Sequence, residues 1–358
     1  MEIFASLPEE VGRECLLRVS CQFHSTLRGV CKSWESVVDS PQFYDDRQKI
    51  GSSEQCICLI QALPCVDKKS QHRMPIYALT LYDPLHGLWQ RKLPPFPELA
   101  HGIPLFSECV TVKNKLILIG GWHPSRWEAM KTVFVYDFSS DRWRKGADMP
   151  TVRSFFACSA SSSEGLVYIA GGHDDSKNAL RAAAVYDVEQ DKWQGLPEMR
   201  EERDECRGAL VEGKFYVISG YDTQSQGRFK QSAEVFDPNS AAWISLESMW
   251  SVGGCPGSCV VFFEYLYAFH KCGVIFRYDS RGNVWKEVAT LPEELDSVRG
   301  ATVWRDTIFV SGTAGVCYMF HPPPLSQKHV NGSRQNWVAV DNTQNFAGIV
   351  QSAATLQI

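Results

Sequence analysis

An aromatic residue followed by an aspartate, with a tryptophan six positions after the aspartate, recurs along most of this chain of 358 residues. The copies are Tyr82-Asp83 with Trp89, Tyr136-Asp137 with Trp143, Tyr186-Asp187 with Trp193, Phe236-Asp237 with Trp243, and Tyr278-Asp279 with Trp285. Successive tryptophans of this set lie 54, 50, 50 and 42 residues apart, and Trp337 follows after a further 52. A repeat near fifty residues built of short strand-like segments is typical of a β-propeller with four-stranded blades. The chain is therefore predicted to be mostly an all-β propeller, in which a binding surface is more expected than a catalytic centre.

Residues 106–145 show how one repeat divides into four strands. Apolar positions alternate from Phe106 to Val112, and a continuous apolar run from Lys115 ends at Gly120-Gly121. A third segment, Lys131 to Asp137, precedes a polar turn and a fourth strand that starts at Asp141. A continuous apolar second strand suits a position packed between neighbouring blades on both faces.

The two ends of the repeat region indicate how the ring closes. The first repeat begins at about Gln55 with a second strand and lacks an inner strand before it, while an apolar tail, Phe346 to Leu356, follows the last outer strand. If the tail supplies the missing strand, no strand edge stays open. The prediction is a six-bladed propeller over residues 55–358, closed by a strand at about 346–356.

The first fifty residues have a helical period instead. Leu7, Val11, Cys15, Leu16 and Val19 recur at helical spacing around Pro8. A second set runs from Phe23 to Val38, where Ser40-Pro41 is expected to end the helix. We expect a small helical domain in residues 1–45 and a linker at 46–54. Because so small a bundle buries little apolar surface, a hydrophobic partner would stabilise it.

Composition excludes several classes of protein. The net charge of −5 disfavours nucleic acid and anionic membranes as general partners, and the N-terminus lacks the features of a secretory signal. A location in the cytoplasm or nucleus, with reduced thiols, is therefore expected. Cys255 and Cys259 have the spacing of half a zinc site, but no second pair stands at ligand spacing, which favours structural cysteines over metal ligands. No cofactor or metal is expected.

The repeat resembles that of the kelch family over roughly residues 55–357, because a double glycine precedes the aromatic-Asp pair and the tryptophan. The positions that carry the repeat are Asp83, Trp89, Gly120, Gly121, Asp137, Trp143, Gly171, Gly172, Asp187, Trp193, Gly220, Asp237, Trp243, Asp279, Trp285 and Trp337. The Trp-Asp dipeptide of WD repeats does not occur in the chain. A kelch-type copper oxidase is the enzymatic alternative, but no phosphate loop, zinc-protease pair or nucleophile elbow is present, so a non-catalytic protein is expected.

The order Leu7-Pro8-Glu9-Glu10-Val11, a helical stretch through Cys31-Lys32-Ser33-Trp34, and Ser40-Pro41-Gln42-Phe43 resembles an F-box. That resemblance implies docking on a Skp adaptor, which is linked to a cullin ubiquitin ligase. The residues on family positions are Leu7, Pro8, Val11, Leu16, Leu17, Leu27, Val30, Cys31 and Trp34. For Val30 and Trp34, packing in the bundle's own core is favoured over adaptor contact, whereas Leu7 and Pro8 are favoured as contacts.

An F-box followed by kelch repeats resembles a class of plant substrate receptors of Skp-cullin-F-box (SCF) ubiquitin ligases. The subgroup linked to turnover of phenylalanine ammonia-lyase and of cytokinin response regulators is the most similar. The resemblance implies a receptor that captures a protein for ubiquitination and proteasomal degradation. The alternative is a kelch scaffold that binds a partner without degradation.

The surface that would capture a target is expected among the loops after each second strand and before each inner strand. The candidates are Trp122, His123, Arg126, Trp127, Arg153, His173, Arg203, Arg207, Tyr221 and Arg299. Aromatic and arginine side chains are frequent anchors of interfaces. The arginines could instead pair within the fold with neighbouring acids such as Glu201 and Glu205, and for any single candidate this structural interpretation is favoured.

Overall fold

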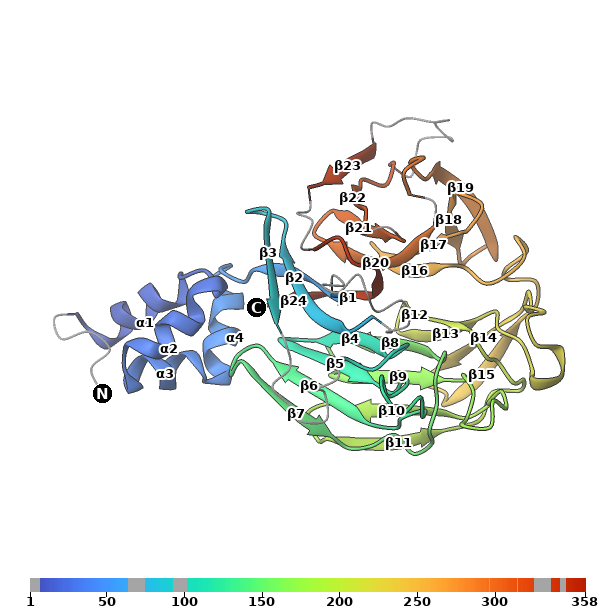
Figure 1. Ribbon diagram of the computed structural model, residues 1–358, viewed down its shortest axis with the longest axis horizontal. Helices are drawn as coiled ribbons and strands as arrows, with labels where there is room; N and C mark the ends of the chain where they lie inside the picture. Colours follow the sequence, from blue (N-terminus) through green and yellow to red (C-terminus); the bar gives the residue numbers. More distant parts are fainter. Residues whose placement is uncertain are drawn as a thin grey trace, which may run out of the picture.

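The computed structural model describes residues 7–63, 75–92, 102–295, 297–313, 315–324, 336–341 and 346–358. A helical module occupies one end of the molecule and a ring of sheets the other (Figure 1). The ring consists of six sheets of four strands each, which confirms the predicted fold class.

Five sheets are formed by consecutive strands, and the remaining sheet combines the two ends of the repeat region. The sheet orders are β24 (Val350–Gln357), β1 (Gln55–Ala62), β2 (Tyr77–Asp83), β3 (Leu88–Lys92); β4 (Glu108–Val112), β5 (Lys115–Ile119), β6 (Val133–Asp137), β7 (Arg142–Gly146); β8 (Ala157–Ser161), β9 (Leu166–Ala170), β10 (Ala183–Asp187), β11 (Lys192–Leu196); β12 (Arg207–Val211), β13 (Lys214–Ile218), β14 (Ala233–Asp237), β15 (Ala242–Leu246); β16 (Ser258–Phe262), β17 (Tyr265–Phe269), β18 (Val274–Asp279), β19 (Val284–Thr290); and β20 (Val298–Trp304), β21 (Thr307–Gly312), β22 (Cys317–Phe320), β23 (Trp337–Val340).

The C-terminal strand closes the ring. β24 pairs antiparallel with β1, with Cys58 opposite Ala354, and so provides the inner strand that the first repeat lacks. The six inner strands contact one another in the order β24, β4, β8, β12, β16, β20 and back to β24. Because β24 lies between β4 and β20, the last residues of the chain complete the propeller.

The spacing of the sequence repeat follows from the hairpin between the third and fourth strands of each blade. The aromatic residue lies directly opposite the tryptophan, as for Tyr186 and Trp193, whose rings stack with centroids 4.9 Å apart. The aspartate between them shapes the turn: Asp187 Oδ1 accepts from the backbone N–H groups of Glu189 at 3.0 Å and Gln190 at 2.8 Å. The turn is therefore held by the same repeat that pairs the rings.

Four of the repeat tryptophans also join their blade to the one before it. Trp193 Nε1 donates to the carbonyl of Ala147 at 2.8 Å, and Trp243 Nε1 donates to that of Pro197 at 2.7 Å. Trp337 and Trp89 make the corresponding bonds to Thr290 and Asp341. Each acceptor belongs to the end or the exit of the outer strand in the preceding blade. The tryptophan of the repeat therefore also links neighbouring blades.

The double glycine permits close approach of the strand ends to the next loop. Gly171 and Gly172 have φ angles of 69° and 78°. A Cβ atom at Gly171 would lie 2.4 Å from the Arg203 carbonyl oxygen, and one at Gly172 would lie 2.4 Å from that of Ser154. Both the backbone conformation and the space therefore require glycine here.

The helical module contains α1 (Glu9–Leu17), η1 (Cys21–Phe23), α2 (His24–Val30), α3 (Lys32–Val38) and α4 (Pro41–Lys49). Two details differ from the sequence-based expectation. The second apolar set forms two helices because Cys31 is extended, and Ser40-Pro41 begins a helix instead of only ending one. Proline is favoured in a first helical turn, where its missing N–H is not needed. The expected linker at 46–54 is therefore helical to Lys49.

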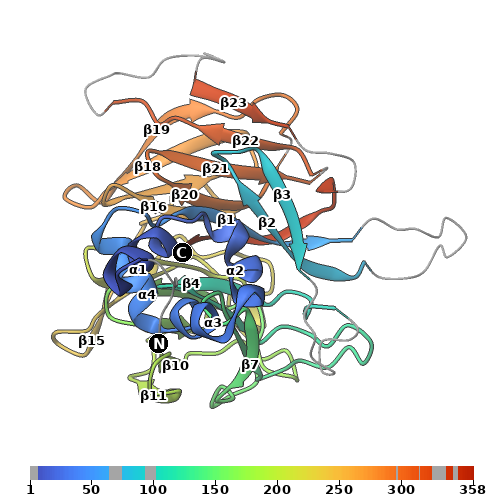
Figure 2. The same ribbon diagram turned by 90° about the vertical axis from the view of Figure 1, so that its left-hand side faces the viewer.

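The helical module rests on the turn between β6 and β7. The carbonyl oxygen of Ser139 accepts from Tyr44 Oη at 3.3 Å and from the Arg28 guanidinium. Leu16, Leu17, Leu27, Val38, Phe43 and Tyr44 belong to one buried apolar cluster with residues of β1, β2, β4, β5, β6 and β24. Figure 2 shows the helices lying against this face of the ring.

The short connection after α4 is held from both sides. Glu54 forms two backbone hydrogen bonds with the C-terminal Ile358, each 2.8 Å long. Its carboxylate accepts from the N–H of Cys21 at 2.7 Å and lies 3.7 Å from the guanidinium of Arg47. Arg47 is fully buried and also donates to the Leu17 carbonyl at 2.7 Å. The helical module and the ring therefore share one junction.

His24 makes this junction sensitive to acid. Burial, assisted by the charge of Arg47, lowers the pKa of His24 from 6.5 to about 4. Since the unfolded chain takes up the proton first, this contribution to stability is complete above about pH 6.5 and is lost as the pH falls toward 4. Between about pH 6.5 and pH 4, the free energy of unfolding of the wild type should fall by up to about 3 kcal/mol more than that of His24→Phe. Thermal melting of both proteins at each pH would measure the difference. Equal pH dependence of the two proteins would contradict the assignment.

Candidate functional site

The helical module presents an exposed apolar surface. Leu7 and Val11 expose 43% and 44% of their surface, and Val30 exposes 54%. Pro8 and Cys31 are exposed beside them in the chain. Leu7, Val11 and Cys15 follow one another at helical spacing. They therefore form one stripe along α1 and the residues just before it. Exposed apolar side chains that gather on one surface often mark a site of protein–protein contact.

The other residues predicted to contact an adaptor belong to the interior of the module. Leu16, Leu17 and Leu27 are buried in the cluster shared with the ring, and Trp34 is partly buried against it. Val30, for which core packing was favoured, is instead exposed. Phe23, which the sequence placed only in a helical set, is also about half exposed.

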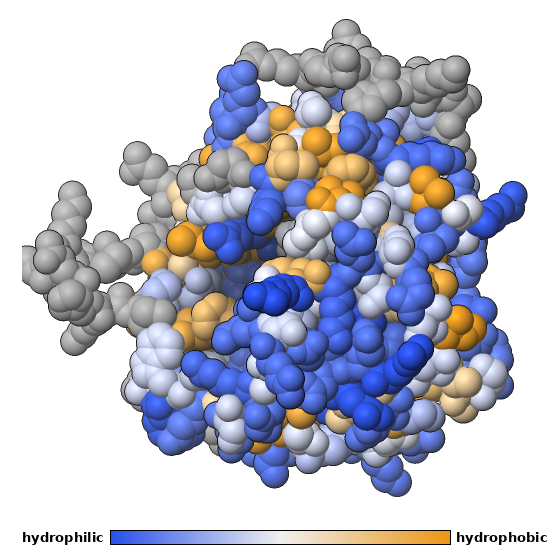
Figure 3. Space-filling view, turned by 90° about the vertical axis from the view of Figure 1, so that its right-hand side faces the viewer, coloured by the Kyte–Doolittle hydropathy of each residue, from blue (hydrophilic) through white to orange (hydrophobic). Residues whose placement is uncertain are grey.

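The opposite face of the ring carries the loops after the second strands and before the inner strands. The β6–β7 turn faces the helices, so these loops lie at the other end of the strands (Figure 1). Figure 3 shows this face, which is hollowed near its centre and has a broad hydrophilic area. All ten candidate target-binding residues lie in these loops or at the adjoining ends of inner strands.

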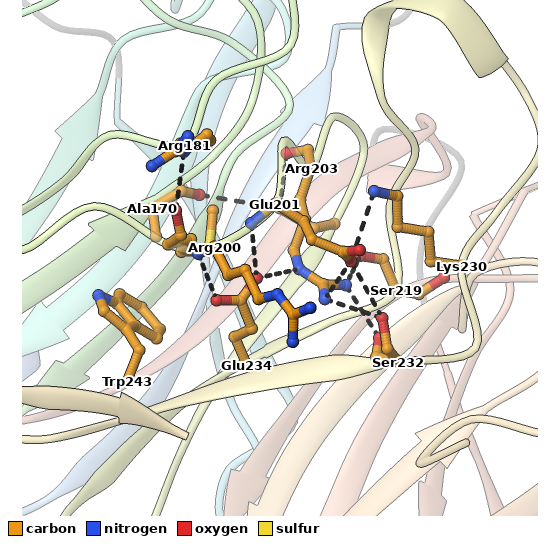
Figure 4. A network of polar contacts seen from close by, with 12 residues as sticks. Ala170, Arg181, Arg200, Glu201, Arg203, Ser219, Lys230, Ser232, Glu234 and Trp243 are labelled. Carbon is orange, nitrogen blue, oxygen red and sulfur yellow. Dashed lines mark hydrogen bonds and ion pairs between the residues drawn. The ribbon is translucent and has the colours of Figure 1, made fainter. Parts of the chain in front are cut away.

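Two of the candidate arginines are fully buried between strands. Arg203 donates to the carbonyls of Ser219 and Ser232, both at 2.9 Å, and its Nε lies 3.1 Å from Oε1 of buried Glu234 (Figure 4). Arg153 donates to the carbonyl of Ala182 at 2.9 Å. In this structure both guanidinium groups are therefore engaged in the blades and do not face the surface.

A polar relay links three neighbouring blades beneath this face. Trp122 Nε1 donates to Ser154 Oγ at 2.9 Å, and Ser154 Oγ lies 2.9 Å from His173 Nε2. His173 Nδ1 lies 2.9 Å from both carboxylate oxygens of Asp204. These contacts have the order of a hydrolase triad, but Ser154 is fully buried and its oxygen already accepts from Trp122. The relay therefore serves to fix Trp122 and His173.

The remaining candidates lie in several blades at the same end of the ring. Trp127 exposes 47% of its surface, and Arg126 forms an exposed ion pair with Glu128 at 3.2 Å. The buried His123 ring accepts from the backbone of Arg126 at 3.3 Å. Arg207 Nε donates to the Gly257 carbonyl at 3.3 Å, Arg299 is exposed at the irregular start of β20, and buried Tyr221 donates to Glu205 at 3.0 Å.

Two regions of the chain match known domain families. An F-box domain matches residues 4–46, and a domain described as FKB95, Kelch-repeats domain matches residues 86–312. The chain belongs to the F-box/kelch-repeat family. Among Arabidopsis thaliana relatives, it is 38% identical to F-box/kelch-repeat protein At1g80440, over 87% of this chain and 88% of that protein. It is 34% identical to F-box/kelch-repeat protein At1g15670 over 100% of both chains.

A third relative has a higher sequence identity over a shorter region. F-box/kelch-repeat protein At2g44130 of Arabidopsis thaliana is 42% identical over 70% of this chain and 66% of its own length. F-box domains generally bind Skp-type adaptors, and kelch domains bind substrates, so this family membership supports a substrate-adaptor role.

Sequence reasoning did not select Phe106 or Phe155, which both stand before inner strands at the loop face. Phe106 was assigned to a strand, but β4 begins at Glu108, and Phe106 has a φ of 57° and exposes 42% of its surface. A possible signal was its position two residues before the inner strand, which Phe155 and Glu205 share.

Within the ranges that the structure describes, no group of three metal-ligating side chains occurs. Nor does any helix in those ranges have the length and apolar character to span a membrane.

Proposed function

We propose that this protein is the substrate-recognition subunit of an SCF-type ubiquitin ligase. Its F-box would dock on a Skp-type adaptor through the stripe that includes Leu7, Pro8 and Val11. The kelch propeller would capture a target protein through the loop face at the far end of the ring. The observation that carries the proposal is the placement of an exposed apolar stripe and a loop face on opposite sides of one shared core.

The mechanism would be tethering. A receptor raises the effective concentration of the target near the charged ubiquitin carrier and restricts its orientation, without side-chain chemistry of its own. The contacts of Ser139 with Arg28 and Tyr44, and those of Glu54 with Ile358, favour a fixed angle between the two modules. A fixed angle gives the target lysines a defined distance from the carrier, which a flexible linker would not.

Binding to a Skp-type adaptor tests the first half of the proposal. In a pull-down with the full-length chain, Leu7→Ala/Pro8→Ala should reduce the retained adaptor by about tenfold or more, because the lost apolar contacts belong to the interface core. Ile244→Ala, an exposed apolar residue on an outer strand of the ring, is the matched control and should leave retention unchanged. Retention of the adaptor by the double variant would contradict the assignment of this stripe as the adaptor-binding surface.

The target is proposed by resemblance only. Phenylalanine ammonia-lyase and a type-B cytokinin response regulator are the candidates, and the protein would meet them in the cytoplasm or nucleus. Cells that carry Leu7→Ala/Pro8→Ala in place of the wild type should accumulate the target, because the variant would hold it without delivering it to the ligase. Quantitative proteomics of these cells would identify the target. Accumulation of neither candidate would remove both from the proposal.

The alternative is a scaffold that binds its partner without degrading it. A scaffold predicts that partners captured by the propeller keep the same lifetime in wild-type cells and in cells with Leu7→Ala/Pro8→Ala. A receptor predicts longer lifetimes only in the variant. Pulse-chase measurement of the captured proteins separates the two functions.

A further inference from the structure

Three successive blades place a side chain at the same point of the loop face. Phe106, Phe155 and Glu205 each stand two residues before an inner strand, namely β4, β8 and β12. Their φ angles are 57°, 55° and 51°, a left-handed conformation that costs about 1 kcal/mol or more for a residue other than glycine. Such strain in three adjacent blades indicates that the placement of these side chains matters. We call these three residues the mouth strip.

The members of the mouth strip are connected by ring contacts and by the polar relay. The rings of Phe106 and Phe155 lie 4.8 Å apart, and the ring of Phe155 lies 5.5 Å from that of His173. His173 is bound to Asp204, whose Oδ1 accepts from the backbone N–H of Glu205 at 2.8 Å. The same step of one blade separates Phe106 from Phe155 and Phe155 from Glu205. The polar relay beneath the strip holds it in place.

The acidic end of the strip is poorly neutralised. Glu205 accepts from Tyr221 Oη at 3.0 Å, and among the residues that the structure describes it has no ion pair with Lys or Arg. Glu202, within the same described ranges, likewise forms hydrogen bonds only with Thr223, at 2.9 and 3.1 Å. Glu202 and Asp222 line an open cleft of about 520 Å³ with Asn178 and Thr223. The cleft places further carboxylates beyond the strip, of which Asp222 pairs with Lys230 at 3.4 Å and Glu202 has hydrogen bonds but no ion pair within the described part of the chain.

Two of the five candidate arginines are not available to attract an acidic segment. Arg153 and Arg203 are fully buried and donate to backbone carbonyls inside the blades. The surface next to the aromatic rings therefore offers carboxylates to a ligand. A basic group beside an apolar one complements it, since a cation gains from both a carboxylate and an aromatic face.

We propose that the mouth strip binds an extended peptide segment in which an aromatic or large aliphatic residue adjoins a lysine or arginine. The apolar side chain packs on Phe106 and Phe155, and the cation pairs with Glu205. This inference deepens the proposed function, on which it rests, because the segment would be the part of the target that marks it for capture. It names the chemistry of that signal as apolar and basic.

Selection from a random peptide library displayed on phage, with the immobilised full-length protein as bait, tests the proposal. The selected peptides should be enriched in an aromatic or large aliphatic residue next to Lys or Arg. Their affinity, measured by fluorescence anisotropy, should fall about tenfold or more with Glu205→Lys, because an attractive pair becomes a repulsive one. Exchanging the peptide's basic residue for Glu should restore binding to Glu205→Lys.

Glu212→Lys is the matched control. Like Glu205, Glu212 is a glutamate with a positive φ, of 49°; it is exposed and lies in the β12–β13 turn on the face toward the helices. Its affinity for the peptides should equal that of the wild type, and unchanged melting temperatures would show that both variants fold. Acidic consensus peptides, peptides insensitive to Glu205→Lys, or a selection that yields no binder would each overturn the proposal. The adaptor pull-down depends on other residues, so it reports separately on the proposed function.

Discussion

Deleting residues 349–358 is expected to abolish the cooperative unfolding of the propeller. The deletion removes β24, and with it the ladder to β1 and the contacts with β4 and β20. It also removes the buried side chains of Val350, Leu356 and Ile358. A buried Leu or Ile truncated to Ala already costs about 2–5 kcal/mol, and a whole domain is stable by only about 5–15 kcal/mol. The shortened chain should therefore be largely unfolded, which circular dichroism and limited proteolysis would detect.

Two point variants separate ring closure from a general effect of changing the C-terminus. Leu356→Asp places a charge at a fully buried position of β24 and should approach the effect of the deletion. Gln357→Ala alters the next residue, which is exposed, and should leave the melting temperature within a degree or so of the wild type. An unchanged melting temperature and protease resistance after the deletion would mean that the ring does not depend on its last strand.

The fold could be predicted because the repeat reports directly on local geometry. An aromatic residue and a tryptophan seven positions apart face each other across one hairpin, as Tyr186 and Trp193 do. The aspartate between them fixes the turn that makes this spacing possible. The missing inner strand and the unassigned apolar tail were complementary, so closure could also be proposed from sequence.

The site was less accessible to sequence reasoning because burial depends on distant segments. For Arg153 and Arg203 the sequence indicated either target binding or ion pairs with neighbouring acids, but it did not reveal that backbone carbonyls at the neighbouring strand ends bind both side chains inside the blades. The exposure of Val30 follows from the break at Cys31, which no spacing rule revealed. The proposed binding role of Phe106 depends on its φ angle and on its contact with the ring of Phe155, one blade away. Neither can be read from the sequence.

The second large effect is expected for Glu234→Ala. Glu234 and Arg203 are both 1% exposed, and the carboxylate accepts from the Arg203 guanidinium and from the backbone N–H groups of Arg200 at 2.7 Å and Glu201 at 3.2 Å. Removing one member of a buried ion pair costs about 3–5 kcal/mol, because the other charge stays buried. Chemical denaturation should show this loss. Glu201→Ala, which removes a partly exposed partner of the same guanidinium, should cost less than about 1 kcal/mol.

The neighbouring blade indicates which part of that loss can be recovered. Arg153 occupies the position of Arg203 there, with the same two kinds of carbonyl acceptor, but Ala184 stands where Glu234 would be. Burial lowers the pKa of Arg153 to about 10, and no residue in the described part of the chain forms a hydrogen bond with its Nε. In the same blade Pro150 stands in the position of Arg200, so one of the N–H groups that Glu234 satisfies does not exist.

A double variant can therefore divide the cost between the charge and the backbone. Arg200→Pro should destabilise the wild type, because it removes a hydrogen bond to Glu234. In the Glu234→Ala background it should instead recover about 1–2 kcal/mol, since it eliminates a buried N–H group that has lost its acceptor. The remaining loss then belongs to the unpaired guanidinium of Arg203. If Arg200→Pro destabilises both backgrounds equally, the Glu234 carboxylate contributes through the ion pair alone, and the blade of Arg153 tolerates its missing carboxylate for another reason.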